Sequence, residues 1–235
     1  MNHEIFWTDE KSARFWNYIA SNKHNYANSF SYQVGEAVID FVESRIPLKG
    51  EILDFGCGQG FLLEKLIKKG ISCQGADFSQ NSIDMVQNKL KSDPNFKGSH
   101  LIISLPSELS EGQFDIIFSI ETIEHLLDTD LDRTMKELYR LLRPNGLIVL
   151  TTPNDEDLEA SKIICPECGC IFHRVQHVRT WTLETLSKSM RGYGFNEVIS
   201  KEIAFRPRSP FNILMNAYER LKDSKKPHII YIGKK

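Results

Sequence analysis

A chain of 235 residues is long enough to form one large α/β domain with a full hydrophobic core. Its 41% apolar and 26% charged residues are typical of an ordinary globular protein. The formal net charge of -2 gives no overall attraction to nucleic acid or to an anionic membrane, so we expect neither as a partner.

The chain shows no secretory signal and no membrane span. Its first ten residues contain neither a basic nor an apolar segment, and no stretch reaches the length that a span needs. We therefore expect a cytoplasmic protein whose five cysteines stay reduced.

The N-terminal residues 1–48 predict a helical cap. They are rich in aromatic side chains and lead into a helix whose apolar residues recur at helical spacing from Val34 to Ile46. Pro47 and Gly50 end that helix.

From residue 51 onward, strand and helix patterns alternate. The predicted strands are 52–55, 71–76, 101–103, 114–120, 147–151, 196–205 and 228–232, and the predicted helices between them are 61–69, 79–90 and 131–142. Buried strands joined by helices predict a doubly wound, mostly parallel seven-stranded sheet in a three-layer α/β/α sandwich. We expect a single domain over 1–235, with a cysteine-containing insertion at 153–181.

A glycine-rich turn follows the first strand, in the sequence Asp54-Phe55-Gly56-Cys57-Gly58-Gln59-Gly60. Glycines let the backbone turn sharply and approach a ligand closely. A dinucleotide-binding turn would need a third glycine where this chain has Phe61. The spacing therefore gives less reason to expect a dinucleotide whose pyrophosphate binds at the helix N-terminus. Asp77 ends the second strand, where a carboxylate can accept both ribose hydroxyls of an adenosine group or simply cap a turn.

These features resemble the class I S-adenosylmethionine-dependent methyltransferases. The resemblance covers residues 30–205 and rests on the loop 54–60, Asp77, the strand 114–120 and the turn 142–146. It implies that Asp54 and the loop amides hold the amino-acid part of the cofactor, that Asp77 holds the ribose, and that the segment near Ser104 borders the adenine. The expected cofactor-binding residues are Asp54, Phe55, Gly56, Cys57, Gly58, Gly60, Asp77, Phe78, Ser104, Leu105, Ser119 and Ile120.

Glu121, Glu124 and His125 follow the fourth strand, and in a helical turn they would share one face. Such a face can supply a general base to an acceptor hydroxyl. It can equally bind a divalent cation such as Mg²⁺ or Mn²⁺, or only orient the loop.

His177 precedes an aromatic-Thr helix start at 181–182 and is the fourth expected member of this catalytic group. The sequence Glu121-x-x-Glu124-His125 together with the later His177 is similar to that of metal-dependent enzymes that methylate the 2′-hydroxyl at RNA 3′ ends. The sequence 121–125 alone is also similar to ubiquinone-pathway O-methyltransferases. Whether His177 serves as base or as metal ligand stays open.

The sequence Cys165-Pro166-Glu167-Cys168-Gly169 has the form of a zinc knuckle. With Cys170 and His173 as further ligands, it predicts a structural zinc ion in the insertion. Reduced cysteines in a lid loop are the alternative.

The favoured function is O-methylation of a sugar, a nucleotide-sugar or another hydroxylated small molecule. RNA terminal methylation is the alternative, which the near-neutral charge counts against. A nicotinamide-dependent oxidoreductase is disfavoured by Phe61, and a non-catalytic cofactor-binding protein by the acid-histidine group. An apolar stripe at 210–221 is expected to pack on its own domain or on a second subunit of a homodimer, rather than on a lipid surface.

Overall fold

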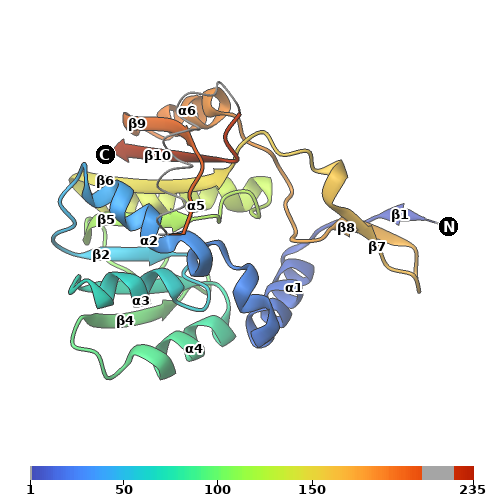
Figure 1. Ribbon diagram of the computed structural model, residues 1–235, viewed down its shortest axis with the longest axis horizontal. Coiled ribbons are helices and arrows are strands. Elements are labelled where there is room, and N and C mark those ends of the chain that lie inside the picture. The colour runs from blue at the N-terminus through green and yellow to red at the C-terminus, as the bar shows by residue number, and fades with distance from the viewer. Residues whose placement is uncertain (1, 208–224) are drawn as a thin grey trace.

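The computed structural model describes residues 2–207 and 225–235 (Figure 1). The apolar stripe expected at 210–221 therefore lies outside the described residues. Within the described part, no helix is both long enough and apolar enough to cross a bilayer.

A seven-stranded sheet forms the centre of the molecule (Figure 1). Its strands, in spatial order, are β4 (Phe96–Leu101), β3 (Cys73–Asp77), β2 (Ile52–Phe55), β5 (Phe114–Ile120), β6 (Leu142–Pro153), β10 (His228–Lys234) and β9 (Asn196–Ile203). Only β10 runs antiparallel to its neighbours, β6 and β9. The doubly wound, mostly parallel sheet predicted from the sequence is confirmed.

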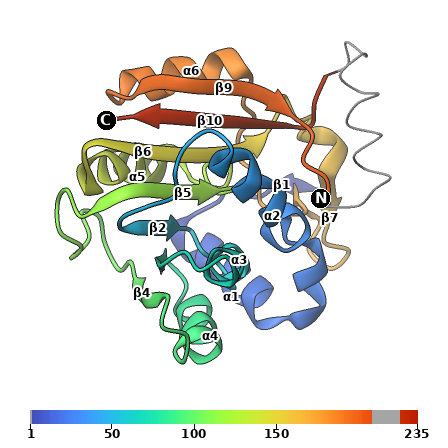
Figure 2. The same cartoon turned by 60° about the vertical axis from the view of Figure 1, so that its left-hand side comes forward.

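Helices cover both faces of this sheet (Figures 1 and 2). They are α2 (Phe30–Glu43), α3 (Phe61–Lys68) and α4 (Gln80–Leu90) on one face, and α5 (Asp128–Leu141) and α6 (Leu183–Gly192) on the other. Alternation along β5 explains the two layers, because Ile116 and Phe118 pack towards the first face and Ile117 towards the second.

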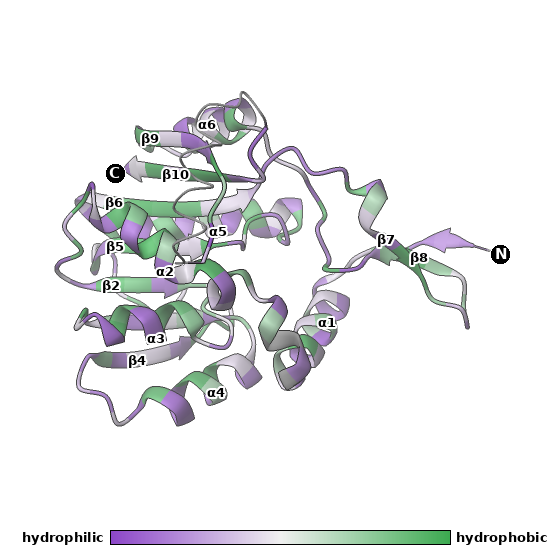
Figure 3. Ribbon diagram, in the orientation of Figure 1, coloured by the Kyte–Doolittle hydropathy of each residue, from purple (hydrophilic) through white to green (hydrophobic). Residues whose placement is uncertain are grey.

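The central strands are accordingly the most hydrophobic part of the ribbon (Figure 3). Ile117 and Phe118 are both fully buried. Removing such a side chain from water contributes about 1.5–3 kcal/mol of folding free energy. The loops that follow the central strands thus start from a well-buried core.

One strand lies elsewhere than predicted. The apolar triplet 101–103 was expected to form the third strand, whereas β4 spans Phe96–Leu101 and Ile103 is 86% exposed. The reason is that β4 is an edge strand with no fully buried residue, so polar residues such as Ser99 are tolerated in it and its hydrophobic signal is weak.

The boundaries of α5 and β6 also differ from the prediction. The helix expected at 131–142 begins a turn earlier, at Asp128, where acidic residues suit a helix N-terminus. The strand expected at 147–151 begins at Leu142, which pairs with Phe114 before a register shift.

The N-terminal segment and the insertion meet in a second, small sheet. It has the order β1 (His3–Glu4), β8 (Cys170–His173), β7 (Lys162–Ile164), and it projects from the main body (Figure 1). Between β1 and α2 lie α1 (Asp9–Ser21) and a 3-10 turn, η1 (Lys23–Asn28), and a short turn, η2 (Glu159–Ser161), precedes β7. The division into one domain with a cap and an insertion stays a prediction.

Candidate functional site

The glycine loop lies at the carboxyl ends of β2 and β3, where ligands bind in open α/β sheets. The amides of Gly56 and Cys57 donate to the carbonyl of Ala76 at 2.8 and 3.0 Å, so the loop is held against β3. Gly60 has a φ of 76°, and a Cβ on it would lie 2.8 Å from Cγ2 of Val86. Glycine is required there for both backbone conformation and space.

Asp77 fastens the other side of the loop. Its Oδ2 accepts from the amide of Gly58 at 2.8 Å, and its Oδ1 accepts from the amide of Ser79, the N-cap of α4, also at 2.8 Å. Each carboxylate oxygen has a second lone pair, so these contacts leave room for ribose hydroxyls. Both roles considered from the sequence, turn organiser and ribose acceptor, are compatible with this arrangement.

Two exposed apolar side chains flank Asp77. Phe78 is 45% exposed, and Ile103 is 86% exposed in the segment whose Ile102 amide donates to the carbonyl of Asp77 at 2.9 Å. Solvent exposure of two large apolar residues beside a polar loop is typical of a surface that a flat apolar ligand covers. Sequence reasoning missed Ile103 because it was assigned to a buried strand.

Asp54 is 2% exposed at the end of β2. Burial, and after it the negative charge of Asp77, raises the pKa of the Asp54 carboxyl to about 8. Among the described residues, no lysine or arginine forms an ion pair with either carboxylate. A desolvated acidic pair without a protein cation fits a ligand that carries positive charge.

The remaining expected cofactor residues contribute in different ways. Phe55 and Ser119 are fully buried and Cys57 and Ile120 nearly so, so these residues belong to the core and offer a ligand little or no exposed surface.

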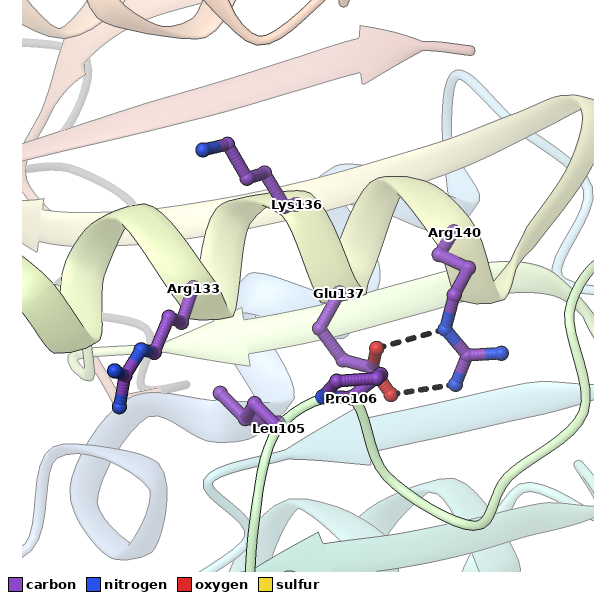
Figure 4. Close-up of a pocket in the computed structure, with 6 residues that line it drawn as sticks. All are labelled: Leu105, Pro106, Arg133, Lys136, Glu137 and Arg140. Atoms are coloured by element: carbon purple, nitrogen blue, oxygen red, sulfur yellow. Dashed lines mark hydrogen bonds and ion pairs between the residues drawn. The ribbon is translucent and has the colours of Figure 1, made fainter.

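Ser104 is exposed, and Leu105 lines a pocket of about 180 Å³ on α5. Figure 4 shows Leu105 and Pro106 facing Arg133 and the Glu137–Arg140 ion pair of that helix. An adenine contact for Ser104 and Leu105 remains a prediction.

Glu124, His125 and His177 converge, with one potential ligand atom of each lying within 4.8 Å of the others. Glu124 is 1% exposed; its Oε2 accepts from the hydroxyl of Thr152 at 3.1 Å, while its buried Oε1 has no hydrogen-bond partner. Nδ1 of His125 donates to the carbonyl of Gln176 at 3.4 Å, which leaves Nε2 as the free lone pair, 3.7 Å from Glu124 Oε1. We name Glu124, His125 and His177 the acid-histidine cluster.

Burial dominates the electrostatics of this cluster. It raises the pKa of Glu124 well above its usual range, with the charge of Glu121 as the next contribution. It lowers the pKa of His125 to about 3, with the neighbouring His177 adding to the effect. Without a ligand, burial therefore favours the protonated carboxyl of Glu124 and the neutral imidazole of His125. A bound cation would favour ionisation of Glu124, and the neutral imidazole of His125 could coordinate it.

Glu121 does not belong to the acid-histidine cluster, and the predicted helical face is wrong. The residues after β5 form a bend and a turn, with Glu121 in the left-handed region at a φ of 49°. Its Oε2 instead lies 3.5 Å from Nδ1 of His228, at the start of β10. Nothing in the sequence spacing connects these two residues, because more than a hundred residues separate them.

The four expected zinc ligands are not brought together. Cys165, Cys168 and Cys170 lie at the β7–β8 turn, where the amide of Cys165 donates to the carbonyl of Cys170 at 2.8 Å. Backbone amides of Cys168 and, next, of Glu167 point at the Cys165 sulfur and lower the pKa of that thiol.

His173 is directed away from these thiols. Cys170 and His173 are three positions apart on β8, and side chains at an odd spacing on a strand point to opposite faces. His173 is buried beside Glu156 and His177. One potential metal-ligand atom of each of the three residues lies within 4.8 Å of the other two. The predicted ligand set of three cysteines and this histidine is therefore corrected.

Helix α1 covers the acid-histidine cluster. The indole ring of Trp16 lies 4.6 Å from the ring of His125, and its Nε1 donates to Oε1 of Gln176 at 2.6 Å. Asn17 of the same helix contacts the hydroxyl of Ser79 at 2.8 Å, at the start of α4. Sequence reasoning missed these residues, because an aromatic-rich N-terminal helix carries no signal for the loop that it covers.

Comparison with known proteins shows the family of this chain. A family model described as a methyltransferase domain matches residues 23–201. The chain belongs to this family and thereby to the class I S-adenosylmethionine-dependent methyltransferase superfamily.

The similarity to individual proteins is more distant. The chain is 36% identical over 115 residues to a ubiquinone biosynthesis O-methyltransferase of Pelagibacter ubique, covering 46% of this chain and 44% of that protein. The chain thus spans about half the length of the curated relatives that it matches.

Among solved structures, the chain resembles the cyclase SpnF, with a TM-score of 0.68 at 16% identity over 100% of this chain and 98% of that one. It also resembles the methyltransferase domain of bacterial CtHen1, with a TM-score of 0.57 at 22% identity over 86% of this chain and 97% of that one. At such identities the likeness shows the fold alone, and a fold by itself does not define a reaction.

The residues at the glycine loop fit S-adenosylmethionine. That cofactor carries an ammonium group and a sulfonium, which suit the buried, unpaired carboxyl of Asp54. Its ribose hydroxyls suit the remaining lone pairs of Asp77, and its adenine ring suits the exposed faces of Phe78 and Ile103.

Proposed function

We propose that the protein is an S-adenosylmethionine-dependent O-methyltransferase whose acceptor hydroxyl is bound at the acid-histidine cluster. Family membership supports the cofactor and the type of reaction. The O-methyltransferase name of the Pelagibacter relative supports oxygen as the acceptor atom. The acceptor class that we favour is a small hydroxylated molecule such as a phenol, a sugar or a nucleotide-sugar, because a net charge of -2 offers little attraction to a polyanion.

On the cofactor side, Asp54 would hold the ammonium group, the loop amides the carboxylate and Asp77 the ribose. The cofactor supplies a methyl group on a positively charged sulfur, and the protein supplies the alignment for in-line attack. A charge-assisted hydrogen bond of the kind expected for Asp54 contributes about 1.5–3 kcal/mol. Its loss would weaken binding roughly ten- to hundredfold.

On the acceptor side, a single observation carries the proposal: a buried glutamate with one carboxylate oxygen lacking a hydrogen-bond partner lies beside two imidazoles, with one potential ligand atom of each residue within 4.8 Å of the others. One carboxylate and two imidazoles suit Mn²⁺ or Zn²⁺ better than Mg²⁺, which prefers oxygen ligands throughout. A cation held by Glu124, His125 and His177 would lower the pKa of an acceptor hydroxyl. The chain's own residues would orient that hydroxyl and exclude water from it, with Trp16 covering the cluster.

The test begins with calorimetric titration of S-adenosylmethionine into the wild type, Asp54→Asn and Asp77→Asn. We expect binding to the wild type and at least tenfold weaker binding to each variant. Binding by the wild type without loss in either variant would place the cofactor elsewhere. An absence of binding to the wild type would refute the methyltransferase proposal.

The cation is tested separately, by titrating Mn²⁺ into the wild type, Glu124→Gln and Glu121→Gln. Glu124→Gln is expected to weaken Mn²⁺ binding at least tenfold, and Glu121→Gln, outside the cluster, to weaken it less. Equal loss in both variants would contradict the assignment of Glu124.

The acceptor is then sought with radiolabelled cofactor. The panel contains phenols, sugars, nucleotide-sugars and an RNA with a free 3′-terminal 2′-hydroxyl, each with and without Mn²⁺. Label on the oxygen of a small molecule supports the proposal. Label on the RNA end alone would select the alternative function predicted from the sequence.

A further inference from the structure

His177 is held from the side opposite the acid-histidine cluster. Its Nδ1 is hydrogen-bonded to Oε2 of Glu156, a residue in the segment that follows β6. The second carboxylate oxygen, Oε1, lies 3.4 Å from Nε2 of His173. The backbone amide of His177 donates in turn to Nδ1 of His173 at 3.1 Å, so each of these three residues contacts the other two.

The direction of these hydrogen bonds determines the protonation of His173. A backbone N–H can only donate, so Nδ1 of His173 must carry a lone pair. The proton of the neutral imidazole is then on Nε2, which lies 3.4 Å from Oε1 of Glu156 without a hydrogen bond to it. While the bond from His177 persists, Nε2 of His173 has no lone pair for a metal ion. The triad Glu156–His173–His177 is therefore not a second cation site, although its potential ligand atoms lie within 4.8 Å of one another.

The same reasoning determines the tautomer of His177. A carboxylate oxygen can only accept, so the hydrogen shared with Glu156 belongs to Nδ1 of His177. In the neutral ring, Nε2 then carries the lone pair, and it is the nitrogen left for the cluster that His177 forms with Glu124 and His125.

The backbone on both sides supports this geometry. Asp155 and Gln176, which precede Glu156 and His177, have φ values of 47° and 59°, a region that non-glycine residues rarely adopt. The ammonium of Lys225 donates to the carbonyl and the carboxylate of Asp155 at 2.6 and 2.9 Å. Gln176 is fully buried, and its side-chain amide donates to the carbonyl of His125 at 2.9 Å.

We propose that Glu156 is a positioning residue that fixes His177 in the Nδ1–H tautomer and so presents Nε2 to Glu124 and His125. Its importance for turnover rests on the proposed function. A carboxylate behind a histidine ligand orients the ring and increases its basicity, and removing such a partner typically weakens metal binding 10- to 100-fold. Nothing in the sequence pattern indicates this role, because Glu156 and His177 lie in separate loops.

The first test reads the tautomer itself, in protein free of metal and cofactor. The ¹⁵N chemical shifts of the His177 ring distinguish Nδ1–H from Nε2–H. We expect Nδ1–H in the wild type, a mixture in Glu156→Ala and mostly Nδ1–H in Glu156→Gln, whose amide oxygen can still accept. The matched control is Glu159→Gln, an exposed glutamate of the same segment that pairs with Lys162. An Nε2–H tautomer in the wild type, or an unchanged Nδ1–H tautomer in Glu156→Ala, would overturn the proposal.

The second test measures Mn²⁺ affinity by calorimetry or by the spin signal of the free ion. We expect a 10- to 100-fold loss in Glu156→Ala, a smaller loss in Glu156→Gln and none in Glu159→Gln. Unchanged binding of S-adenosylmethionine by Glu156→Ala shows that the variant is folded. If the wild type does not bind Mn²⁺, the proposed cation site fails, but the tautomer measurement still decides the role of Glu156. Unchanged Mn²⁺ affinity in Glu156→Ala would contradict the positioning role.

Discussion

Asp54 couples the stability of the unliganded protein to pH. Its carboxyl is buried at the end of β2, and burial raises its pKa from 3.8 to about 8. A group whose pKa is higher in the folded state stabilises that state fully below its unfolded pKa and loses this contribution as pH rises through the folded pKa. The contribution of Asp54 to stability therefore falls progressively between about pH 4 and about pH 8, by up to ~1.4 kcal/mol per pH unit, and the full cost persists above pH 8.

We predict that Asp54→Asn removes this pH dependence. We compare the melting temperatures of the variant and of the wild type without ligand. The difference, variant minus wild type, should increase from pH 5 to pH 8 and then level off. Asp84→Asn, on the exposed side of α4, is the control and should show a constant difference. A difference between Asp54→Asn and the wild type that stays the same at pH 5 and pH 9 would contradict the buried, ionisable state described for Asp54.

The glycine loop allows a matched comparison between two glycines. Gly60 and Gly70 both have a φ of 76°, but a Cβ on Gly60 would lie 2.8 Å from Val86, whereas nothing lies within 4 Å of one on Gly70. We predict that Gly70→Ala costs about 1–2 kcal/mol, the usual penalty of the left-handed conformation. Gly60→Ala should cost clearly more and should weaken cofactor binding.

Urea unfolding curves and calorimetry measure the two effects. In Gly60→Ala, a second change of Val86 to Ala should recover part of the loss, because it removes the atom that the new Cβ meets. Equal destabilisation by Gly60→Ala and Gly70→Ala would show that Val86 moves away from the new Cβ without a cost in folding free energy, which would contradict the prediction.

At the scale of elements, α1 connects both halves of the site. Trp16 contacts the acid-histidine cluster, and Asn17 contacts the start of α4 beside Asp77. Trp7, just before the helix, packs edge-on against Phe172 of the small sheet, with ring centroids 6.4 Å apart. The N-terminal segment is thereby fixed both to the insertion and to the start of α4, so the environment of the acid-histidine cluster depends on the docking of this helix.

We predict that Trp16→Phe lowers the free energy of unfolding by about 1–3 kcal/mol. The substitution keeps an aromatic ring near His125 but leaves Oε1 of the fully buried Gln176 without its donor. It should reduce Mn²⁺ affinity more than cofactor affinity, because Gln176 supports His125 and precedes His177. Tyr18→Phe, at a 63% exposed position of the same helix, is the control. An effect of the same size at Tyr18 would mean that α1 responds to any change rather than to the loss of this hydrogen bond.

At the scale of the whole molecule, the site draws its residues from both halves of the sheet. The glycine loop follows β2 and Asp77 ends β3, whereas the acid-histidine cluster combines the turn after β5 with the insertion after β6. A ligand that bridges these segments binds only the folded state, so it stabilises the entire domain by mass action.

S-adenosylmethionine at 100 times its dissociation constant should stabilise the protein by about 2.7 kcal/mol. For a chain of this size, that corresponds to a rise of about 5–11 °C in melting temperature. The rise should be largely absent in Asp54→Asn at the same cofactor concentration. A scanning fluorimetry series in cofactor concentration measures it, and a constant melting temperature would indicate that the cofactor does not bind the folded chain.

The sequence by itself determined the architecture and the glycine loop of this protein. The continuous buried runs of β5 and of the second half of β6, and the glycines after β2, are properties of consecutive residues, so local pattern and backbone conformation are enough to predict them. The same holds for Asp77, whose place at the end of β3 follows from the strand pattern. The weak signal of the edge strand β4 is the one place where this local reasoning misplaced a strand.

Only the tertiary structure decided which ionisable residues face one another. Glu121 turns to His228 instead of joining Glu124, His173 turns to Glu156 instead of the cysteines, and Glu156 meets His177 from a separate loop. Each of these pairings depends on a left-handed residue, on the face of a strand or on the approach of two loops. Such properties follow from how the whole chain packs, and the spacing of residues along it does not contain them.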